Sequence, residues 1–234
     1  MSKEIIIKNL NYNILKELSI SFDNNMFYTV TSPNRSGKTS LLKYINKEYN
    51  SSLIDNNLYF NEEIVVNEVK LSLINNNLFN KEYLNHIIRK YELEDIKNKD
   101  IYSLSLEYKI FLKLIISIIN NNKIILLDNI DNYVSDELMI KILDLIKEEK
   151  KEKLIIMTLT NLKYSIDSDY LYVINKDKII LEGKPIEVLK NDNILNKNGI
   201  DLPFMIDLST KLRDYNLLDT IITDMDGMVD LLWK

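Results

Sequence analysis

Residues 27–42, FYTVTSPNRSGKTSLL, decide the fold that we predict for this chain. A run of β-branched and aromatic residues ends at a Ser-Pro-Asn turn, and Gly37, Lys38 and Thr39 then open an apolar-periodic segment. A strand, a loop and a helix in this order form the setting that a phosphate-binding P-loop requires. N–H groups of the loop and the helix would hold the phosphates, Lys38 would reach the β and γ oxygens, and Thr39 would bind Mg²⁺.

The match to the P-loop pattern is incomplete, because Ser32 stands at its first glycine position. The alternative is an ordinary turn before a helix, with Lys38 in solvent. The flanking strand and helix favour the P-loop, since the Gly-Lys-Thr triplet alone occurs in many chains. The residues that we predict to bind nucleotide in this loop are Asn34, Arg35, Ser36, Gly37, Lys38, Thr39 and Ser40.

The composition of the chain is that of a soluble globular protein, with 46% hydrophobic and 28% charged residues among 234. This length suits one large domain, or a domain with an appendage. The formal net charge of −5 argues against a broad nucleic-acid-binding face. The chain has no cysteine and only one histidine, His86, which excludes disulfides and any thiolate or multi-histidine metal site.

No apolar run approaches the ~20 residues that span a bilayer. The best candidate, residues 110–119, is short and interrupted by Lys113, and the N-terminus lacks the apolar segment of a secretory signal. Any association with a membrane would therefore come through a partner. The absence of cysteine fits the cytoplasm.

Strand and helix patterns alternate through the centre of the chain, which predicts an α/β fold with a mostly parallel sheet flanked by helices. Residues 4–10 and 18–22 form an N-terminal antiparallel pair in this prediction, and a polar linker with two short helices follows residue 191. The remaining predicted strands cover 53–60, 123–128 and 154–157 and a hairpin at 170–174 and 178–181; the predicted helices begin at 39 and cover 62–99, 105–119 and 135–150.

Asp128 ends the apolar run at 123–128. A buried parallel strand after a P-loop places its C-terminal carboxylate beside the phosphates, where it can hold Mg²⁺ through water. The alternative role is that of an ordinary helix cap. His86 falls on a predicted helix far from the P-loop, which favours a surface or interface position.

The order of these motifs resembles the ATP-binding cassette (ABC) ATPases. A Leu-Ser segment at 104–105 opens a helix, and Asp128 follows Ser105 by 23 positions, the family's spacing. Residues 169–189 are similar to the last hairpin and following helix of the cassette. The tail, with GIDLPF at 199–204, is similar to ATPase subunits of energy-coupling-factor (ECF) vitamin and metal importers.

This resemblance covers essentially the whole chain and implies its domains, ligands and partners. Residues 1–190 would form the nucleotide-binding domain, with a helical subdomain at 61–105, and 191–234 a helical appendage. The subdomain should be reduced, because only 67 positions separate Lys38 from Ser105. The chain would bind ATP and Mg²⁺, pair with a second ABC ATPase and dock on a transmembrane coupling subunit at the cytoplasmic face of the cell membrane. No nucleic-acid partner is expected.

The resemblance also implies roles for two residues outside the P-loop. Ser105 would contact the ATP held mainly by the partner cassette. Tyr12 would stack on adenine, although a core tyrosine is an equal alternative.

Several positions depart from the family pattern. Asn129 occupies the position of the family's general-base glutamate, and a carboxamide cannot accept a proton near neutral pH. Thr160 occupies the position of the family's switch histidine. The family also has a glutamine before the signature, and no glutamine occurs anywhere in this chain. Other departures lie at the signature glycines, at the dimer-contact aspartate and at the glutamine before the signature: Leu106, Glu107, Ser135 and Asn61.

These departures predict weak ATP hydrolysis at the chain's own site, with Glu107 adding a negative charge near the partner's phosphates. The leading hypothesis is an ATP-binding subunit that couples ATP binding and hydrolysis to micronutrient uptake. The alternatives are a non-catalytic or structural subunit beside an active cassette, and a soluble cassette acting on nucleic acid.

Overall fold

The computed structural model describes residues 3–176 and 178–232. The ends of the predicted domains, residues 1–2 and 233–234, and Asp177 in the predicted hairpin turn lie outside the described residues. The strands are β1 Lys3–Tyr12, β2 Leu15–Asp23, β3 Phe27–Thr31, β4 Ser51–Ile54, β5 Ile124–Asp128, β6 Leu154–Thr158, β7 Tyr170–Asn175 and β8 Lys178–Gly183. The α-helices are α1 Lys38–Glu48, α2 Val65–Asn75, α3 Lys81–Lys90, α4 Leu106–Ile119, α5 Asp136–Glu149, α6 Pro185–Leu189, α7 Asp192–Lys197, α8 Phe204–Asp214 and α9 Met225–Leu232.

The core is a six-stranded sheet in the order β4-β5-β6-β3-β7-β8, and β1 and β2 form a separate antiparallel pair. Strands β4, β5, β6, β3 and β7 pair in parallel, and β8 pairs antiparallel with β7. The predicted fold class is therefore confirmed. The P-loop strand β3 lies inside the sheet between β6 and β7, so the loops after β3 and β6 lie side by side.

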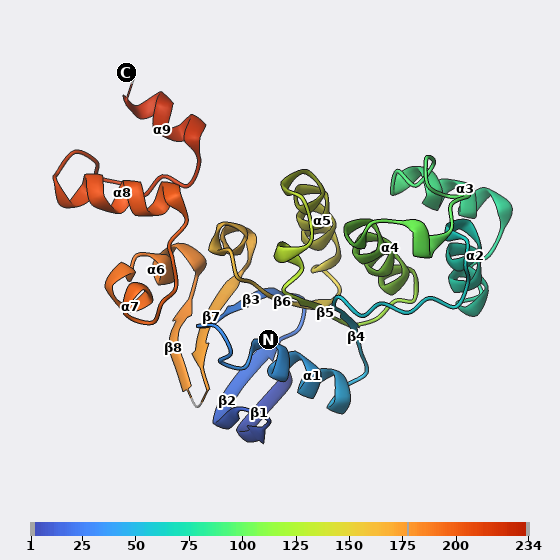
Figure 1. Ribbon diagram of the computed structural model, residues 1–234, viewed down its shortest axis with the longest axis horizontal. Coiled ribbons are helices and arrows are strands. Elements are labelled where there is room, and N and C mark those ends of the chain that lie inside the picture. Colours follow the sequence, from blue (N-terminus) through green and yellow to red (C-terminus); the bar gives the residue numbers. More distant parts are fainter. Residues whose placement is uncertain (1–2, 177, 233–234) are drawn as a thin grey trace.

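Helices cover both faces of this sheet, and the apolar residues of its strands alternate between two hydrophobic clusters. Ile125 and Leu127 belong to the cluster with α4 and α5, whereas Ile124 and Leu126 belong to the cluster with α1 and the β1–β2 ribbon. Figure 1 shows these two layers on opposite sides of the sheet. A strand buried on both faces is apolar along its length, as β5 is from Ile124 to Leu127, before it ends at Asp128.

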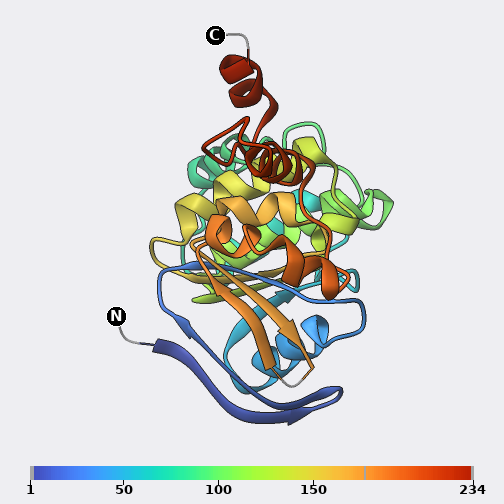
Figure 2. The same cartoon turned by 90° about the vertical axis from the view of Figure 1, so that its left-hand side faces the viewer.

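The C-terminal helices form a third region beyond the hairpin β7–β8. Leu171 and Val173 of β7 pack in one cluster with Leu189, Leu195 and Ile206. Figure 2 shows α8 and α9 at the opposite end of the molecule from the β1–β2 ribbon. No helix in the described ranges is long and apolar enough to cross a membrane.

Three predicted elements differ from the structure. The strand expected at 53–60 ends at Ile54, because the Asp55 carboxylate accepts the N–H of Asn57 at 2.8 Å and turns the chain. The helical pattern at 62–99 is divided into α2 and α3, with Asn77 in the left-handed region at φ 57°. The linker expected after residue 191 begins with the short helix α7.

Candidate nucleotide-binding site

The P-loop turns from the end of β3 into α1 through a left-handed glycine. Gly37 caps α1 with φ 112°, a backbone conformation that favours glycine. A Cβ added at this position would lie 2.3 Å from Leu15 Cδ2. Glycine is therefore required at this position on two grounds, the backbone angle and the space.

Lys38 is buried directly after this turn, with 9% of its surface exposed. Its Nζ donates to the backbone carbonyl of Ser32 at 3.2 Å. Burial lowers the pKa of Lys38, and the negative charges of Asp131 and Asp128 oppose that shift. The lysine is thus folded back over its own loop, which rules out the alternative of a lysine in solvent.

Thr39 and Asp128, the two predicted Mg²⁺ residues, are in direct contact. Thr39 Oγ1 donates to Asp128 Oδ1 at 3.2 Å, and Thr158 Oγ1 donates to the same oxygen at 2.7 Å. A hydroxyl and a carboxylate at this distance are the hard oxygen ligands that Mg²⁺ prefers. The donor set of the site therefore fits a magnesium ion.

Asn129 follows Asp128 in the left-handed region, with φ 49°. Its Nδ2 donates to Asp128 Oδ1 at 2.8 Å and to Thr39 Oγ1 at 3.4 Å. Its backbone N–H donates to Thr158 Oγ1 at 2.9 Å. The side-chain amide acts here as a donor that holds the Asp128 carboxylate in place.

A hollow of about 330 Å³ lies over this network. It is lined by Ile14, Ser32, Asn34, Arg35, Ser36, Gly37, Lys38, Thr39, Ser40, Asn129, Asn132 and Thr160. The structure thus brings together every predicted residue of the P-loop with Asn129 and Thr160. Ile14 and Asn132 also line the hollow and were not predicted, because neither belongs to a motif.

Tyr12 and Ser105 do not line this hollow. Tyr12 is half-buried and packs against Tyr44 of α1, with 5.6 Å between the ring centroids. Ser105 is exposed and caps α4. The role of Tyr12 in stacking on adenine and the contact of Ser105 with a partner's ATP remain predictions.

The loop after β6 is fastened by a residue that sequence reasoning missed. Asp131 Oδ2 accepts the backbone N–H groups of Thr160 at 2.8 Å and Asn161 at 2.7 Å. Burial raises the pKa of Asp131, whereas these two N–H groups and the charge of Lys38 lower it. Its one signal in the sequence is its position three residues after Asp128, in the loop after β5.

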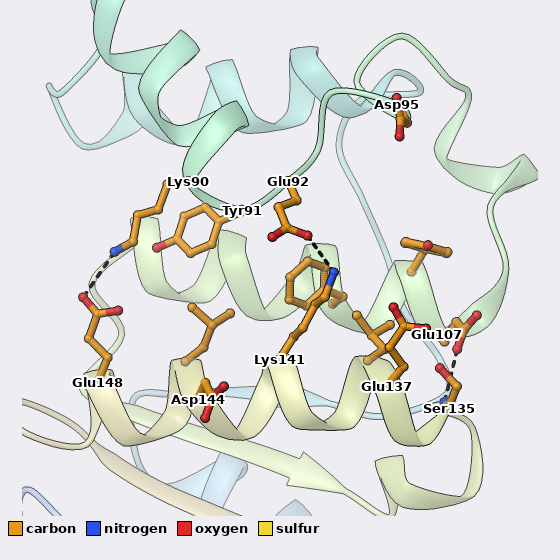
Figure 3. A pocket seen from close by; sticks show the side chains of 14 residues that line it. Lys90, Tyr91, Glu92, Asp95, Glu107, Ser135, Glu137, Lys141, Asp144 and Glu148 are labelled. Atoms are coloured by element: carbon orange, nitrogen blue, oxygen red, sulfur yellow. Dashed lines mark hydrogen bonds and ion pairs between the residues drawn. The ribbon is translucent and has the colours of Figure 1, made fainter.

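Glu107, at a signature glycine position, is engaged within its own chain. Its Oε2 accepts the backbone N–H of Ser135, at the start of α5, at 3.1 Å. Both residues line a larger hollow of about 540 Å³ between α4, α5 and the loop after α3, shown in Figure 3. In this structure the Glu107 carboxylate therefore accepts a hydrogen bond from an N–H group at the N-terminus of α5, where a negative charge is favourable.

Asn61, the residue nearest to the missing glutamine, does not line the hollow over the P-loop. Its backbone N–H donates at 2.9 Å to the carboxylate of Glu68, which also accepts the N–H of Glu62 at 2.8 Å. Glu68 is 1% exposed, so this segment is anchored from within the fold. His86 is exposed on α3 beside Tyr83, as predicted.

No protein-family model matches the chain. The energy-coupling factor transporter ATP-binding protein EcfA1 of Mesomycoplasma hyopneumoniae strain 7448 is 24% identical over 97% of this chain and 93% of its own length. The corresponding EcfA of Pediococcus pentosaceus is 22% identical over 97% of this chain and 95% of its own length. A shorter match, 36% identical over 31% of this chain and 28% of its own length, is to EcfA1 of Mycoplasmopsis pulmonis.

Two solved structures show the same fold. The cbiO1 protein of Clostridium perfringens, described as part of the ABC transporter complex cbiONQ, superposes with a TM-score of 0.68 at 17% identity, over 89% of this chain and 98% of that one. The ATP-binding cassette MJ0796, a dimer bound to ADP and Pi, superposes with a TM-score of 0.64 at 16% identity, over 77% and 98%. The chain therefore has the fold of an ABC ATPase and resembles, over almost its whole length, the ATP-binding proteins of ECF transporters.

Proposed function

We propose that this chain is the ATP-binding subunit of an ECF-type importer. The observation that carries the proposal is that Lys38 and Thr39 line one hollow at the end of β3 and that Thr39 is hydrogen-bonded to Asp128. The loop and the start of α1 would bind the phosphates through backbone N–H groups, and Lys38 would leave the Ser32 carbonyl to reach them. Thr39 and, through water, Asp128 would hold a Mg²⁺ ion, which neutralises phosphate charge when bound.

The chain's own site is impaired for hydrolysis in this proposal. Asn129 donates to Asp128 and has no basic oxygen with which to take a proton from water. Thr160 has no titratable group in place of the switch histidine. The expected consequence is that nucleotide binds and turns over slowly at this site.

Transport by the complex would require two partners of this chain. A second ABC ATPase would close over the nucleotide with its signature segment, while Ser105 of this chain contacts the nucleotide of the partner. A transmembrane subunit would hold the pair at the cytoplasmic face of the membrane and pass the micronutrient. Full-length similarity to the ECF ATP-binding proteins supports both expectations.

A second candidate is a non-catalytic subunit that keeps the shape of the cassette beside an active partner. The loss of the glutamate at Asn129 favours it, because a paired cassette with an intact base would supply all hydrolysis. The two candidates differ in whether this chain's pocket turns over ATP at all.

Co-purification from membranes tests the proposed function. The full chain carries an affinity tag at its N-terminus and is extracted with mild detergent from its own organism, and an untagged culture serves as control. We expect a transmembrane protein and a second ABC ATPase to elute in fixed ratio with the tagged chain. Recovery of the chain alone, or with nucleic acid that salt removes, would contradict the proposal.

A further inference from the structure

Asp131 lies behind the wall of the nucleotide hollow, in the short 3₁₀ helix Ile130–Asn132 after β5. Its Oδ2 holds the N–H groups of Thr160 and Asn161, and the neighbouring Asn132 donates to Thr160 Oγ1 at 3.3 Å. Asn132 and Thr160 line the hollow, whereas Asp131 does not. The carboxylate thus joins the loops after β5 and β6 directly beneath the surface that would face the phosphates.

The second oxygen of this carboxylate, Oδ1, is enclosed and has no hydrogen-bond partner among the described residues. A buried carboxylate oxygen without a donor is unusual, because its desolvation is costly. Since it is closed off from solvent, this oxygen cannot take a proton from an attacking water. Asp131 is therefore not a replacement for the missing general base.

Lys38 supplies the opposite charge. Of the two carboxylates that favour its charged form, Asp131 has the larger effect and Asp128 the smaller. An ammonium group has three N–H donors, and among the residues that the structure describes Lys38 Nζ donates one hydrogen bond, to Ser32. Asp131 is therefore a negative charge that acts on Lys38 from beneath the hollow that Lys38 lines.

We propose that Asp131 determines the affinity and specificity of the pocket for phosphate groups. Its buried negative charge balances Lys38 when the pocket holds no nucleotide, and it repels the terminal phosphates when nucleotide binds. The repulsion is weaker for Mg·ATP, because the metal cancels two of the negative charges of ATP. The pocket therefore selects the magnesium complex over free ATP; this inference rests on the proposed ATP-binding function.

The test compares the affinities of the purified full chain for free ATP, in excess chelator, and for Mg·ATP by calorimetry. Asp131→Asn removes the charge and keeps a carbonyl that can accept an N–H of the β6 loop. We expect it to bind free ATP at least about fivefold more tightly than the wild type, with a smaller gain for Mg·ATP. Asp131→Glu keeps the charge and should retain the wild-type preference for Mg·ATP.

Asp128→Asn is the matched control for a carboxylate that holds the metal. It should also improve binding of free ATP, but it should lose the gain that Mg²⁺ provides. Asp131→Asn should thus bind Mg·ATP more tightly than free ATP by a smaller factor than the wild type does, whereas Asp128→Asn should bind the two forms alike. This difference separates the two carboxylates.

Two results would overturn the inference alone. In the first, the wild type binds ATP and Asp131→Asn binds free ATP no more tightly. In the second, Asp131→Asn and Asp131→Glu weaken binding equally and lower the melting temperature, which would show that the carboxylate only fastens the loop. If the wild-type chain bound neither form of ATP, the proposed function itself would fail, and this inference with it.

Discussion

Asn129→Glu places a carboxylate where the family has its general base, and the structure predicts its effect on stability. The amide at Asn129 donates to Asp128 Oδ1 at 2.8 Å, and losing a hydrogen bond to a charged group costs about 1.5–3 kcal/mol. The left-handed backbone at φ 49° suits asparagine and costs most other residues about 1–2 kcal/mol. Repulsion between the carboxylates of residue 128 and the new glutamate adds to this, and rotation of the half-buried side chain toward solvent reduces it.

We therefore expect Asn129→Glu to lower the free energy of unfolding by about 2.5–5 kcal/mol without Mg²⁺, the sum of the same two terms. Added Mg²⁺ should restore part of the loss. Asn129→Gln is the matched control, because it carries the same backbone cost without a new charge. Urea unfolding of both variants, with and without Mg²⁺, separates the charge from the backbone.

The same substitution should accelerate ATP turnover. A positioned general base contributes about 10²–10⁴-fold, and we expect the lower end, about 100-fold, because Thr160 offers no histidine. Phosphate release is measured with the chain assembled with its wild-type partners. If Asn129→Glu bound Mg·ATP as tightly as the wild type and turned over no faster, the missing carboxylate would not be what limits hydrolysis.

Three further perturbations follow from the site and its supports. Gly37→Ala should lower the free energy of unfolding by about 2–4 kcal/mol, from a left-handed backbone and a 2.3 Å contact with Leu15; an unchanged urea midpoint would refute this. Glu68→Ala should cost about 2–3 kcal/mol, since it leaves the N–H groups of Asn61 and Glu62 without their carboxylate, and Glu68→Gln should cost less. Hydrogen bonds from Lys163 and Tyr164 hold the pKa of Asp136 below its usual value, so its stabilising effect should be present at neutral pH and lost as pH falls below about 4. Because Asp136 is exposed, Asp136→Asn should cost less than about 1 kcal/mol at pH 7, and still less as pH falls through the lowered pKa of Asp136, as followed by thermal unfolding.

The elements around the nucleotide site could be predicted because a short run of residues indicates each of them. The β-branched run at 27–31, the Gly-Lys-Thr triplet and the apolar run that ends at Asp128 each have a local periodicity or motif. The parallel arrangement of buried strands then dictates that Lys38, Thr39 and Asp128 meet at one end of the sheet.

Other contacts depend on which loops the fold brings together. Asp131 contacts Thr160 and Asn161, about thirty positions later, and a single aspartate after a strand gives no signal of this pairing. Glu107 was expected near a partner's phosphates because the prediction considered only its place in the signature. Its contact with the Ser135 N–H depends on the packing of α4 beside α5.

The central claim is that Lys38 holds nucleotide in the hollow over β3, and one calorimetric titration tests it most directly. Mg·ATP is titrated into the purified full chain and into Lys38→Met, which keeps the length of the side chain and removes its charge. We predict that the wild type binds Mg·ATP and that Lys38→Met, with an unchanged melting temperature, loses most of that affinity. No binding to the wild type, or equal binding to both proteins, would contradict the account.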